Sequence, residues 1–519
     1  MSRLSDIPGE TFSIPGLIKR NHELRGDAPA LLLDETAAGR AEAAGQEASR
    51  AKEGRAAQAI SYSELYHVAG LLCDLLSQKF HGAHIGILGE NSNEWFLAFL
   101  GILCSSSAAV PVEIELSAEE AAGRLLRADC EAVFLSEDYR DYGEVFAARG
   151  IEVLSLTLVK DMITAVTKDG KKTEHDLRCQ IPSDTPAAIL FTSGTSGEPK
   201  AAVLSHKGLL SNVRAIDERI PRIPGVLFLV PLPLYHAFPL SASLGALLAH
   251  APAICFTSVR RILREMPRRK PHYILAVPAA VELIYENVKD LSEAQIKEFS
   301  GGRVAGVISG GAYLAPAIQE GMCGKGLPVV QGYGMTECSP IIAVDELKTG
   351  IHTGSVGRAI GGCTVSVSCP DENGVGELTV RGDNLMTEYY RDPEATAQTI
   401  RDGVLYTGDL GYLDENGYIY LTGRKKDLII LSNGKNVSPE ELEGMFAPFP
   451  YIRAVRVYEE DGRITGEFAL NKEQWPDAEE RLKKDVLSVN RSLPKYKNIV
   501  SVKIGSALPG KKLFRWERQ

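Results

Sequence analysis

The sequence predicts an α/β fold with a large N-terminal domain, residues 1–424, and a small C-terminal α+β domain, residues 425–519. The chain has 519 residues, more than one hydrophobic core usually serves. Apolar runs alternate with amphipathic segments between about residues 84 and 312, which is typical of parallel strands joined by helices. The strands shorten from about residue 353, and the pattern changes again after Arg424. We therefore expect parallel-type sheets, then a β-rich subdomain, then the small domain.

The N-terminal elements follow from local patterns. ALLLD at 30–34 and AISYSEL at 59–65 are expected to pair as a hairpin, the second strand leading into a helix at about 63–79. The insertion at 35–58 is rich in Ala, Glu, Arg and Gly and holds no aliphatic residue larger than alanine. Such a segment cannot contribute to a core, so we expect it to be flexible. An Ala/Glu/Arg-rich stretch near 117–128 predicts another helix.

The C-terminal elements are shorter and more polar. ELTVRG and GVLYTGDLGYLDENGYIYL, with its Asp-Glu-Asn-Gly turn, predict short strands joined by tight turns. Beyond them we expect helices at about 439–446 and 477–492 beside the strands AVRVYEE, ITGEFAL and VSVKI.

Composition excludes several classes of protein. The nine cysteines form no CxxC pair and no Cys/His cluster at zinc spacing, so we expect reduced core cysteines. A net charge of −10 argues against a general nucleic-acid surface. The start, MSRLSDIPGETFSIPG, lacks a secretory signal, and the apolar stretches are too short or too interrupted to cross a bilayer. We expect a soluble, cytoplasmic protein with at most a peripheral membrane contact.

One local exception to the acidic balance is a basic segment around residues 260–270. A solvated helix face is the simpler interpretation, and a landing site for a polyanionic ligand or an acidic carrier protein is the alternative. The segment contains Arg260, Arg261, Arg264, Arg268, Arg269 and Lys270.

The segment TSGTSGEPK, residues 192–200, combines the residue types that bind nucleotide phosphates, directly after the apolar run 187–191. Its glycines let the backbone turn N–H groups toward an anion, its hydroxyls donate, and its lysine adds positive charge. It is not a Walker A loop, because the lysine follows Glu-Pro and no Ser or Thr comes next to hold magnesium. A solvated turn is the alternative. The candidate phosphate ligands are Thr192, Ser193, Gly194, Thr195, Ser196, Gly197 and Lys200.

A second glycine-rich segment, QGYGMTE at 331–337, follows two valines and so ends a strand, where open α/β sheets place ligands. Tyr333 can stack on a base. Glu337 can supply an oxygen ligand for magnesium, with the Thr336 hydroxyl on a phosphate beside it. A core aromatic and a helix N-terminal carboxylate are the alternatives for Tyr333 and Glu337.

A third segment runs from YTGDLG to SPEELE, residues 406–443. Asp409 lies between Gly408 and Gly411, where its carboxylate can accept hydrogen bonds from two ribose hydroxyls. Arg424 can reach the same sugar or its phosphate. Each feature alone is an ordinary turn, whereas all three segments in this order indicate a nucleotide site.

Together these segments resemble the acyl-adenylate-forming superfamily, which includes acyl-CoA synthetases, luciferases and the adenylation domains of peptide synthetases. The resemblance covers nearly the whole chain. It rests on TSGTSGEPK, PLPLYH, SGGA, QGYGMTE, YTGDLG and GRKKDLIILSNGKNVSPEELE. The last segment is most similar to that of AMP-forming long-chain fatty acyl-CoA ligases.

The resemblance implies a two-step reaction. ATP, with Mg²⁺, activates a carboxylic acid, a medium- or long-chain fatty acid, to acyl-AMP with release of pyrophosphate, and the acyl group then passes to CoA. Residues 192–200 would hold the β- and γ-phosphates, Glu337 the metal, and Thr336 the α-phosphate. His236 would stand at the carboxylate end of the acyl pocket. The remaining implied ATP contacts are Gly310, Gly311, Ala312, Gln331, Gly332, Tyr333, Gly334, Asp409 and Arg424.

The superfamily also carries a catalytic lysine near its C-terminus, which bridges carboxylate and phosphate during adenylation. In ALPGKKLFRWERQ, Lys512 best fits the family register, and Lys511 is the alternative because it directly follows the glycine. A further departure is Ala201, where the family usually has glycine.

In such enzymes the small C-terminal domain is mobile and rotates between the two half-reactions. By position, Lys426 would be the pivot, while Gly434 and Lys435 would line the tunnel for the thiol. An exposed loop is the alternative interpretation of these residues.

Two other functions stay open. The acceptor can be the phosphopantetheine arm of an acyl carrier protein instead of CoA, which the basic segment motivates. The chain can also be a non-catalytic module that binds a nucleotide.

Overall fold

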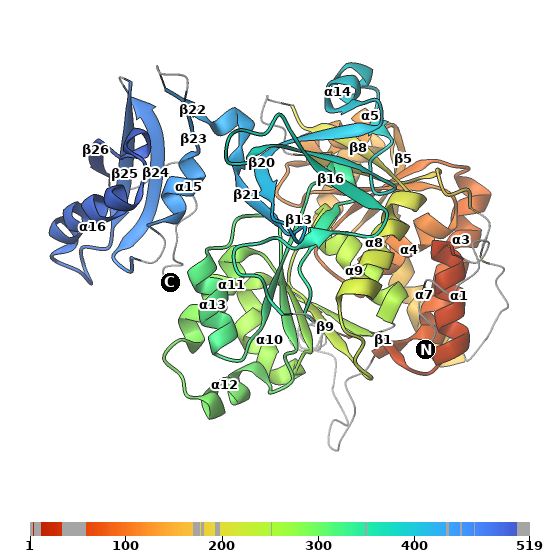
Figure 1. Cartoon of the computed structure of the whole chain (residues 1–519). Coiled ribbons are helices and arrows are strands. Elements are labelled where there is room, and N and C mark those ends of the chain that lie inside the picture. The colour runs from red at the N-terminus through yellow and green to blue at the C-terminus, as the bar shows by residue number, and fades with distance from the viewer. Residues whose placement is uncertain are drawn as a thin grey trace.

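In a computed structural model of the chain, the described residues are 4, 12–33, 59–169, 177, 181–192, 198–250, 252–347, 350–431, 435–446, 449–460 and 462–505. Figure 1 shows two large sheets with their helices gathered into one body, with the C-terminal part, in blue, to one side. The predicted fold class is confirmed. The predicted flexible insertion at 35–58 lies outside the described residues.

The sheet that carries the QGYGMTE segment has nine strands within the described residues, in the order β15-β14-β13-β12-β11-β9-β10-β1-β2. Its central strands are parallel, as the buried apolar runs predict, and both ends turn antiparallel. Its strands are β1 (Pro29–Leu32), β2 (Ala59–Ser61), β9 (Leu227–Val230), β10 (Ala253–Phe256), β11 (Tyr273–Ala276), β12 (Gly306–Ser309), β13 (Val329–Gly334), β14 (Ile341–Val344) and β15 (Arg358–Ala359).

A second sheet, with seven strands in the described ranges, carries the ends of the TSGTSGEPK segment in the order β18-β8-β7-β4-β3-β5-β6. Strands β7 and β8 pair antiparallel, so the described ends of the segment, Thr192 and Lys200, lie opposite each other. Its strands are β3 (His84–Leu88), β4 (Ala108–Val112), β5 (Cys130–Leu135), β6 (Glu152–Ser155), β7 (Pro186–Thr192), β8 (Lys200–Ser205) and β18 (Glu388–Tyr389).

The helices cover these sheets, and several start at side-chain caps. Ser61 and Glu64 form a capping box at the start of α3, and Ser117 and Glu120 form another at α5, which confirms both predicted helices. The helices are α1 (Ile14–Arg25), α3 (Tyr62–Lys79), α4 (Asn93–Cys104), α5 (Ala118–Arg127), α6 (Gly143–Ala147), α7 (Leu156–Asp169), α8 (His206–Arg219), α9 (Ala237–His250), α10 (Ile262–Arg269), α11 (Pro278–Val288), α12 (Glu293–Ser300), α13 (Pro316–Gly324) and α14 (Pro393–Thr399). Helices α4, α8 and α9 share one hydrophobic cluster with strands of both large sheets.

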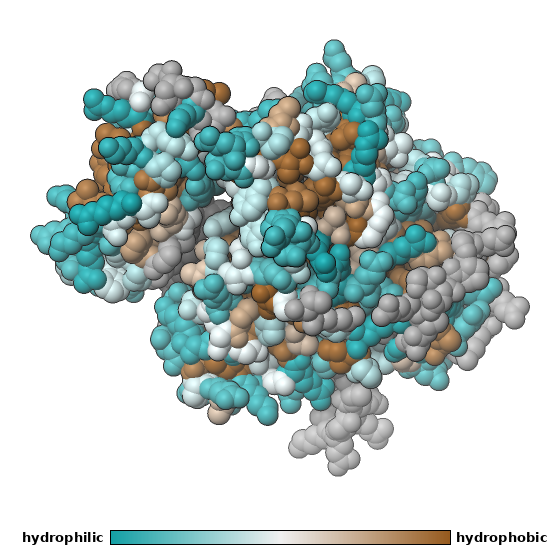
Figure 2. All heavy atoms as spheres, viewed as in Figure 1, coloured by the Kyte–Doolittle hydropathy of each residue, from teal (hydrophilic) through white to brown (hydrophobic). Residues whose placement is uncertain are grey.

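The predicted β-rich subdomain is an antiparallel sheet of short strands. It contains β16 (Cys363–Ser368), β17 (Gly376–Gly382), β19 (Ile400–Arg401), β20 (Val404–Leu413) and β21 (Ile419–Arg424). Figure 2 shows a mostly hydrophilic surface on this face, with apolar side chains gathered over the region of β16 and β20.

The C-terminal part has a hydrophobic core of its own, whose buried members lie between Ile429 and Ile499. Its two predicted helices and three predicted strands are present, and β25 pairs antiparallel with β24 and parallel with β26. Its elements are β22 (Ile429–Ile430), β23 (Asn436–Val437), α15 (Pro439–Gly444), β24 (Ile452–Glu460), β25 (Arg463–Leu470), α16 (Ala478–Ser492) and β26 (Ser501–Gly505). The boundary at residue 424 and the mobility of this part stay predictions.

Two further expectations concern cysteines and membranes. The cysteines in the described ranges are free, and most are buried. Among the helices of those ranges, none is long and apolar enough to cross a bilayer.

His206 gives the fold a pH dependence. This first residue of α8 is buried, and neither ring nitrogen has a hydrogen-bond partner among the described residues. Burial lowers the pKa of His206 to about 4. Unfolded histidine titrates near pH 6.5, so between these values the unfolded chain binds a proton that the folded chain does not. The contribution of neutral, buried His206 to the free energy of unfolding is complete above about pH 6.5 and is lost as the pH falls toward about 4.

We expect the free energy of unfolding to fall by about 3 kcal/mol across that window because of this one group. Urea unfolding of the wild type and His206→Leu, in steps from about pH 7 to about pH 4, measures the effect. In His206→Leu, this part of the decrease in unfolding free energy with falling pH should be absent. An unchanged slope would contradict the assignment.

Candidate nucleotide and acid site

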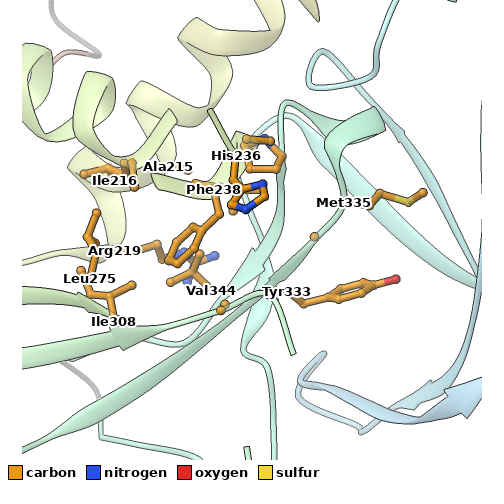
Figure 3. Close-up of a pocket in the computed structure, with 18 of the residues that line it drawn as sticks. Ala215, Ile216, Arg219, His236, Phe238, Leu275, Ile308, Tyr333, Met335 and Val344 are labelled. Carbon is orange, nitrogen blue, oxygen red and sulfur yellow. The ribbon is translucent and has the colours of Figure 1, made fainter. Parts of the chain in front are cut away.

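A cavity of about 280 Å³ lies between α8 and the carboxyl ends of β12 and β13. Figure 3 shows His236, Phe238, Tyr333 and Met335 toward one end of it and Ile216, Leu275 and Arg219 toward the other. The lining is mostly apolar. The predicted site residues that line it are His236, Gly310, Gly311, Gly332, Tyr333, Gly334 and Thr336.

Two glycines of this wall are required by the backbone. A Cβ added at Gly334 would overlap the Pro340 carbonyl oxygen. Gly311 has φ +86°, which few other residues adopt without strain. A Cβ at Gly310 would only make ordinary contact with the Phe238 ring, at 3.4 Å.

The predicted sugar-binding residues come together around Asp409. The Tyr333 hydroxyl donates to Asp409 Oδ2 at 2.7 Å, and Arg424 Nε lies 3.1 Å from Asp409 Oδ1. Asp409 and Arg424 are directly paired across β20 and β21, which explains why residues 15 positions apart meet. The Asp409 backbone N–H also donates to the Thr407 hydroxyl at 3.0 Å.

Burial shifts the pKa values of both Asp409 and Tyr333. Burial raises the pKa of the Asp409 carboxyl, against the opposing hydrogen bond from Tyr333 and the charge of Arg424. Burial, and then the Asp409 charge, raise the pKa of the Tyr333 hydroxyl well above its ordinary range. Tyr333 therefore stays a neutral donor, and Asp409 accepts its hydrogen bond behind the cavity wall.

The predicted metal ligand, Glu337, lies near the predicted phosphate ligand Lys200. Tyr389, which the sequence did not single out, contacts both residues. Tyr389 donates its hydroxyl to Glu337 Oε1 at 2.6 Å, and Lys200 Nζ lies 4.9 Å from the centroid of the Tyr389 ring. Glu337 is only 7% exposed. The Tyr389 hydroxyl thus binds the Glu337 carboxylate, while its ring lies beside the Lys200 ammonium.

The fold explains this arrangement. Strand β18 pairs with β8 next to the start of β8 at Lys200, with Tyr389 opposite Ala202. The Met386 N–H donates to the Glu337 carbonyl oxygen at 2.8 Å, which ties the same strand to the end of QGYGMTE. A single carboxylate suits Mg²⁺, which is commonly held by one or two carboxylates together with substrate phosphates.

The ends of TSGTSGEPK are described, and its middle is not. Thr192 and Lys200 are cross-strand partners, and the Thr192 hydroxyl donates to the Lys200 carbonyl oxygen at 3.4 Å. These ends lie at the base of the hairpin beside Tyr389. The predicted ligands Ser193, Gly194, Thr195, Ser196 and Gly197 lie outside the described residues.

Other predicted residues lie apart from the cavity. Gln331 is buried and donates to Gln319 Oε1 at 2.9 Å, on the side of α13, while Ala312 is exposed. Lys426 lies in the single turn Lys425–Asp427 that leads out of β21. Lys435 Nζ sits 4.2 Å from the Tyr496 ring centroid, within the small domain. Gly434, Lys511 and Lys512 lie outside the described residues.

A wider cavity of about 970 Å³ opens between the β-rich subdomain and the small domain. It is lined by Glu377 and Tyr406 on one side, by Glu441 and Lys497 on the other, and it reaches Tyr389. Lys425 pairs with Glu377 at 2.8 Å and Lys497 with Glu441 at 2.7 Å. These paired charges make its lining more mixed than that of the apolar cavity.

Sequence reasoning missed Tyr389, Phe238 and Arg219 in these clusters. Phe238 follows His236 by two residues, so its position beside a predicted site residue was a usable signal. Tyr389 and Arg219 offered no such signal, because a tyrosine pair before a turn and an arginine ending an amphipathic helix are ordinary features.

The sequence profile of the AMP-binding enzyme family matches residues 38–390. The chain belongs to the AMP-binding enzyme family. It is 26% identical over 427 residues to the long-chain-fatty-acid–CoA ligase FadD15 of Mycobacterium bovis, covering 72% of this chain and 70% of the relative. It is 28% identical over 450 residues to 4-coumarate–CoA ligase 3 of Oryza sativa subsp. japonica, covering 81% and 78%.

A solved structure agrees with this placement. The ATP-bound crystal structure of MatB from Rhodopseudomonas palustris superposes with a TM-score of 0.78 at 26% identity, covering 96% of each chain. The predicted superfamily and the predicted class of this AMP-binding enzyme, an AMP-forming acid–thiol ligase, are confirmed. The named relatives act on acids as different as a long-chain fatty acid and 4-coumarate, so the acid must be inferred from the cavity.

Proposed function

We propose that the protein uses ATP and Mg²⁺ to convert a carboxylic acid to acyl-AMP, with release of pyrophosphate, and then transfers the acyl group to CoA. One observation carries the proposal. The apolar cavity, the Tyr333–Asp409–Arg424 cluster and the Lys200–Tyr389–Glu337 cluster meet around the short segment 333–337. An acid, a sugar and a polyphosphate can thus be held side by side.

In the first step, each group of residues would bind a different part of the two substrates, the acid and ATP. The acid would lie in the cavity with its carboxylate toward His236 and Thr336. Asp409 would accept hydrogen bonds from the ribose hydroxyls, and Tyr333 and the glycines at 310 and 311 would frame adenine. Lys200 and the segment at 192–197 would neutralise the β- and γ-phosphates, with the Thr336 hydroxyl on the α-phosphate.

Glu337 would hold Mg²⁺, which lowers the repulsion between the acid and the polyphosphate when it is bound. The hydrogen bond from Tyr389 fixes one Glu337 oxygen, so the carboxylate is oriented before the metal binds. The positive charge at the reacting oxygens would come from Lys512, and Lys511 is the alternative.

The second step requires a change in the C-terminal domain. We propose that residues 425–519 rotate about Lys426, which lies at the exit of β21, two residues after Arg424. Lys435 and Gly434 would then line the path of the thiol. The wide polar cavity between the β-rich subdomain and the small domain gives this rotation space.

The cavity supports an acid of medium length. Its volume of about 280 Å³ is at the low end of the usual range for ligand pockets. A medium-chain acid is therefore favoured over the long-chain alternative.

Pyrophosphate exchange tests the proposal. Purified protein, ATP, Mg²⁺ and labelled pyrophosphate are incubated with acids from acetate to palmitate, and label entering ATP is measured, with acid omitted as the control. Exchange should depend on the acid and be greatest at medium length. A chain that only binds nucleotide would give no exchange with any acid, and that result would refute the proposal.

The acceptor is a separate question, because the basic segment on α10 favours a carrier protein as a second candidate. Arg260, Arg264, Arg268 and Lys270 are exposed there, while the buried Glu265 pairs with Arg269 at 3.2 Å. Thioester formation with CoA is compared with that on a holo acyl carrier protein. Equal or better use of CoA would reject the carrier protein, and a strong preference for the carrier would reject CoA.

A further inference from the structure

Helices α8 and α9 both contribute to the wall of the acid cavity. On α9, Ala242 lines the cavity, whereas Gly245, one turn further along the same face of the helix, is not part of the lining. On α8, Ile216 lines it. Figure 3 shows Ile216 and Leu275 toward one end of the cavity and His236 toward the other, where the carboxylate of the acid would lie.

Ile216 occupies the space that a side chain at Gly245 would need. A Cβ added at Gly245 would lie 2.4 Å from Ile216 Cδ1 and 3.4 Å from Ile216 Cγ1, with the Val213 Cα next at 3.6 Å. Carbon atoms that are not bonded to each other prefer separations of about 3.5–4.0 Å. Both residues are buried, and Ile216 also borders the cavity. Ile216 therefore lies between the Gly245 backbone and the acid cavity.

The cavity is the space into which Ile216 can move. Protein interiors are close-packed, so a displaced side chain moves toward a void where one adjoins it. The overlapping atom, Cδ1, is the end of a side chain that can change its rotamer, and no backbone atom lies as close to the added Cβ. A methyl group at Gly245 would therefore push the tip of Ile216 toward the cavity and make the cavity shorter.

We propose that the contact between Gly245 and Ile216 sets the depth of the acid cavity, and with it the longest acid that the enzyme uses. The inference rests on the proposed function, since it names residues that set specificity at that same site. Ile216, Leu275 and Ile308 are apolar, so the part of the acid that meets them is its alkyl end. Gly245 acts through Ile216 and is a positioning residue.

The dependence of pyrophosphate exchange on acid length gives the first test. For the wild type and Gly245→Ala, kcat/KM is measured with each straight-chain saturated acid from acetate to palmitate. The longest acids that the wild type uses well should lose roughly ten- to hundredfold in the variant, which is the discrimination that one methylene gives in an apolar pocket. Short acids and the KM for ATP should be unaffected. An unchanged profile, or an equal loss at every length, would overturn the inference.

A second substitution should reverse the effect. Ile216→Val removes Cδ1, the atom that a methyl group at Gly245 would overlap, and keeps Cγ1, which would lie at 3.4 Å. The double variant Gly245→Ala/Ile216→Val should therefore use the longest acids to within a few-fold of Ile216→Val alone. Such a recovery would not occur if Gly245→Ala acted by a general disturbance of the fold. A double variant as impaired as Gly245→Ala would overturn the role of Ile216.

The matched control is Gly123→Ala, which makes the same change inside α5. A Cβ at Gly123 would meet no heavy atom of the described residues within 4 Å, and Gly123 is outside the cavity lining. The dependence on acid length should be that of the wild type. If Gly123→Ala shifted it as Gly245→Ala does, the effect would not belong to the contact with Ile216 and the inference would fall.

Thermal unfolding shows whether each variant is folded. If Gly245→Ala alone does not fold, Ile216→Ala carries the test, because it shortens the side chain that ends the cavity. It should raise kcat/KM by roughly tenfold for acids just longer than those that the wild type uses, and no gain would overturn the inference. An absence of exchange with every acid in the wild type would instead refute the proposed function, and this inference with it.

Discussion

Replacing Glu337 with glutamine should lower the rate of acyl-AMP formation by roughly 10²- to 10³-fold, because the variant loses the negative charge that would hold Mg²⁺. The fold should be retained. A glutamine Oε1 can still accept the hydrogen bond that Tyr389 donates to Glu337 at 2.6 Å. Pyrophosphate exchange, followed as a function of Mg²⁺ concentration, measures the effect.

The neighbouring residues provide the controls. Glu388→Gln changes an exposed carboxylate one position from Tyr389 and should leave the rate near that of the wild type. Tyr389→Phe removes only the hydroxyl, so the Mg²⁺ concentration needed for half-maximal exchange should rise while the maximal rate changes less. A Glu337→Gln rate close to that of Glu388→Gln would mean that Glu337 does not hold the metal.

Replacing Lys512 with alanine should reduce adenylation by roughly 10²-fold or more, since the reaction would lose a preorganised positive charge at the reacting oxygens. Transfer of the acyl group from preformed acyl-AMP to CoA should continue near the wild-type rate. The two half-reactions are measured separately, by pyrophosphate exchange and by thioester formation from synthetic acyl-AMP.

The adjacent lysine is the matched control for this change. Lys511→Ala removes the same charge one position earlier and should spare both half-reactions. If Lys511→Ala impairs adenylation and Lys512→Ala does not, the register of the C-terminal motif is shifted by one residue. Impairment of both half-reactions in Lys512→Ala would argue for a structural role instead.

Local sequence predicted most of the fold. The hairpin around the 35–58 insertion, the helices α3, α5, α15 and α16, and the short strands after residue 353 are present as expected. Periodicity and capping residues act over a few positions, so their effects are visible in a short stretch of sequence. The glycines at 311 and 334 answer local needs too, because positive φ at Gly311 and close packing at Gly334 exclude larger side chains.

Sequence alone determined the identity of the enzyme class, since three glycine-rich segments in a set order carry the family's chemistry. It also placed Tyr333, Asp409, Arg424, Glu337 and Lys200 in one nucleotide site, and the structure brings them near one another.

The tertiary structure alone decided which side chains complete the site. Tyr389 reaches Glu337 across 52 positions of sequence only because β18 pairs with β8. Arg219, at the end of α8, lines the same cavity as residues of β12 and β13, which are far from it in sequence. Gln331, the first residue of QGYGMTE, turns away from the cavity, and its amide donates to Gln319. Long-range packing sets these contacts, and no pattern within a single segment specifies them.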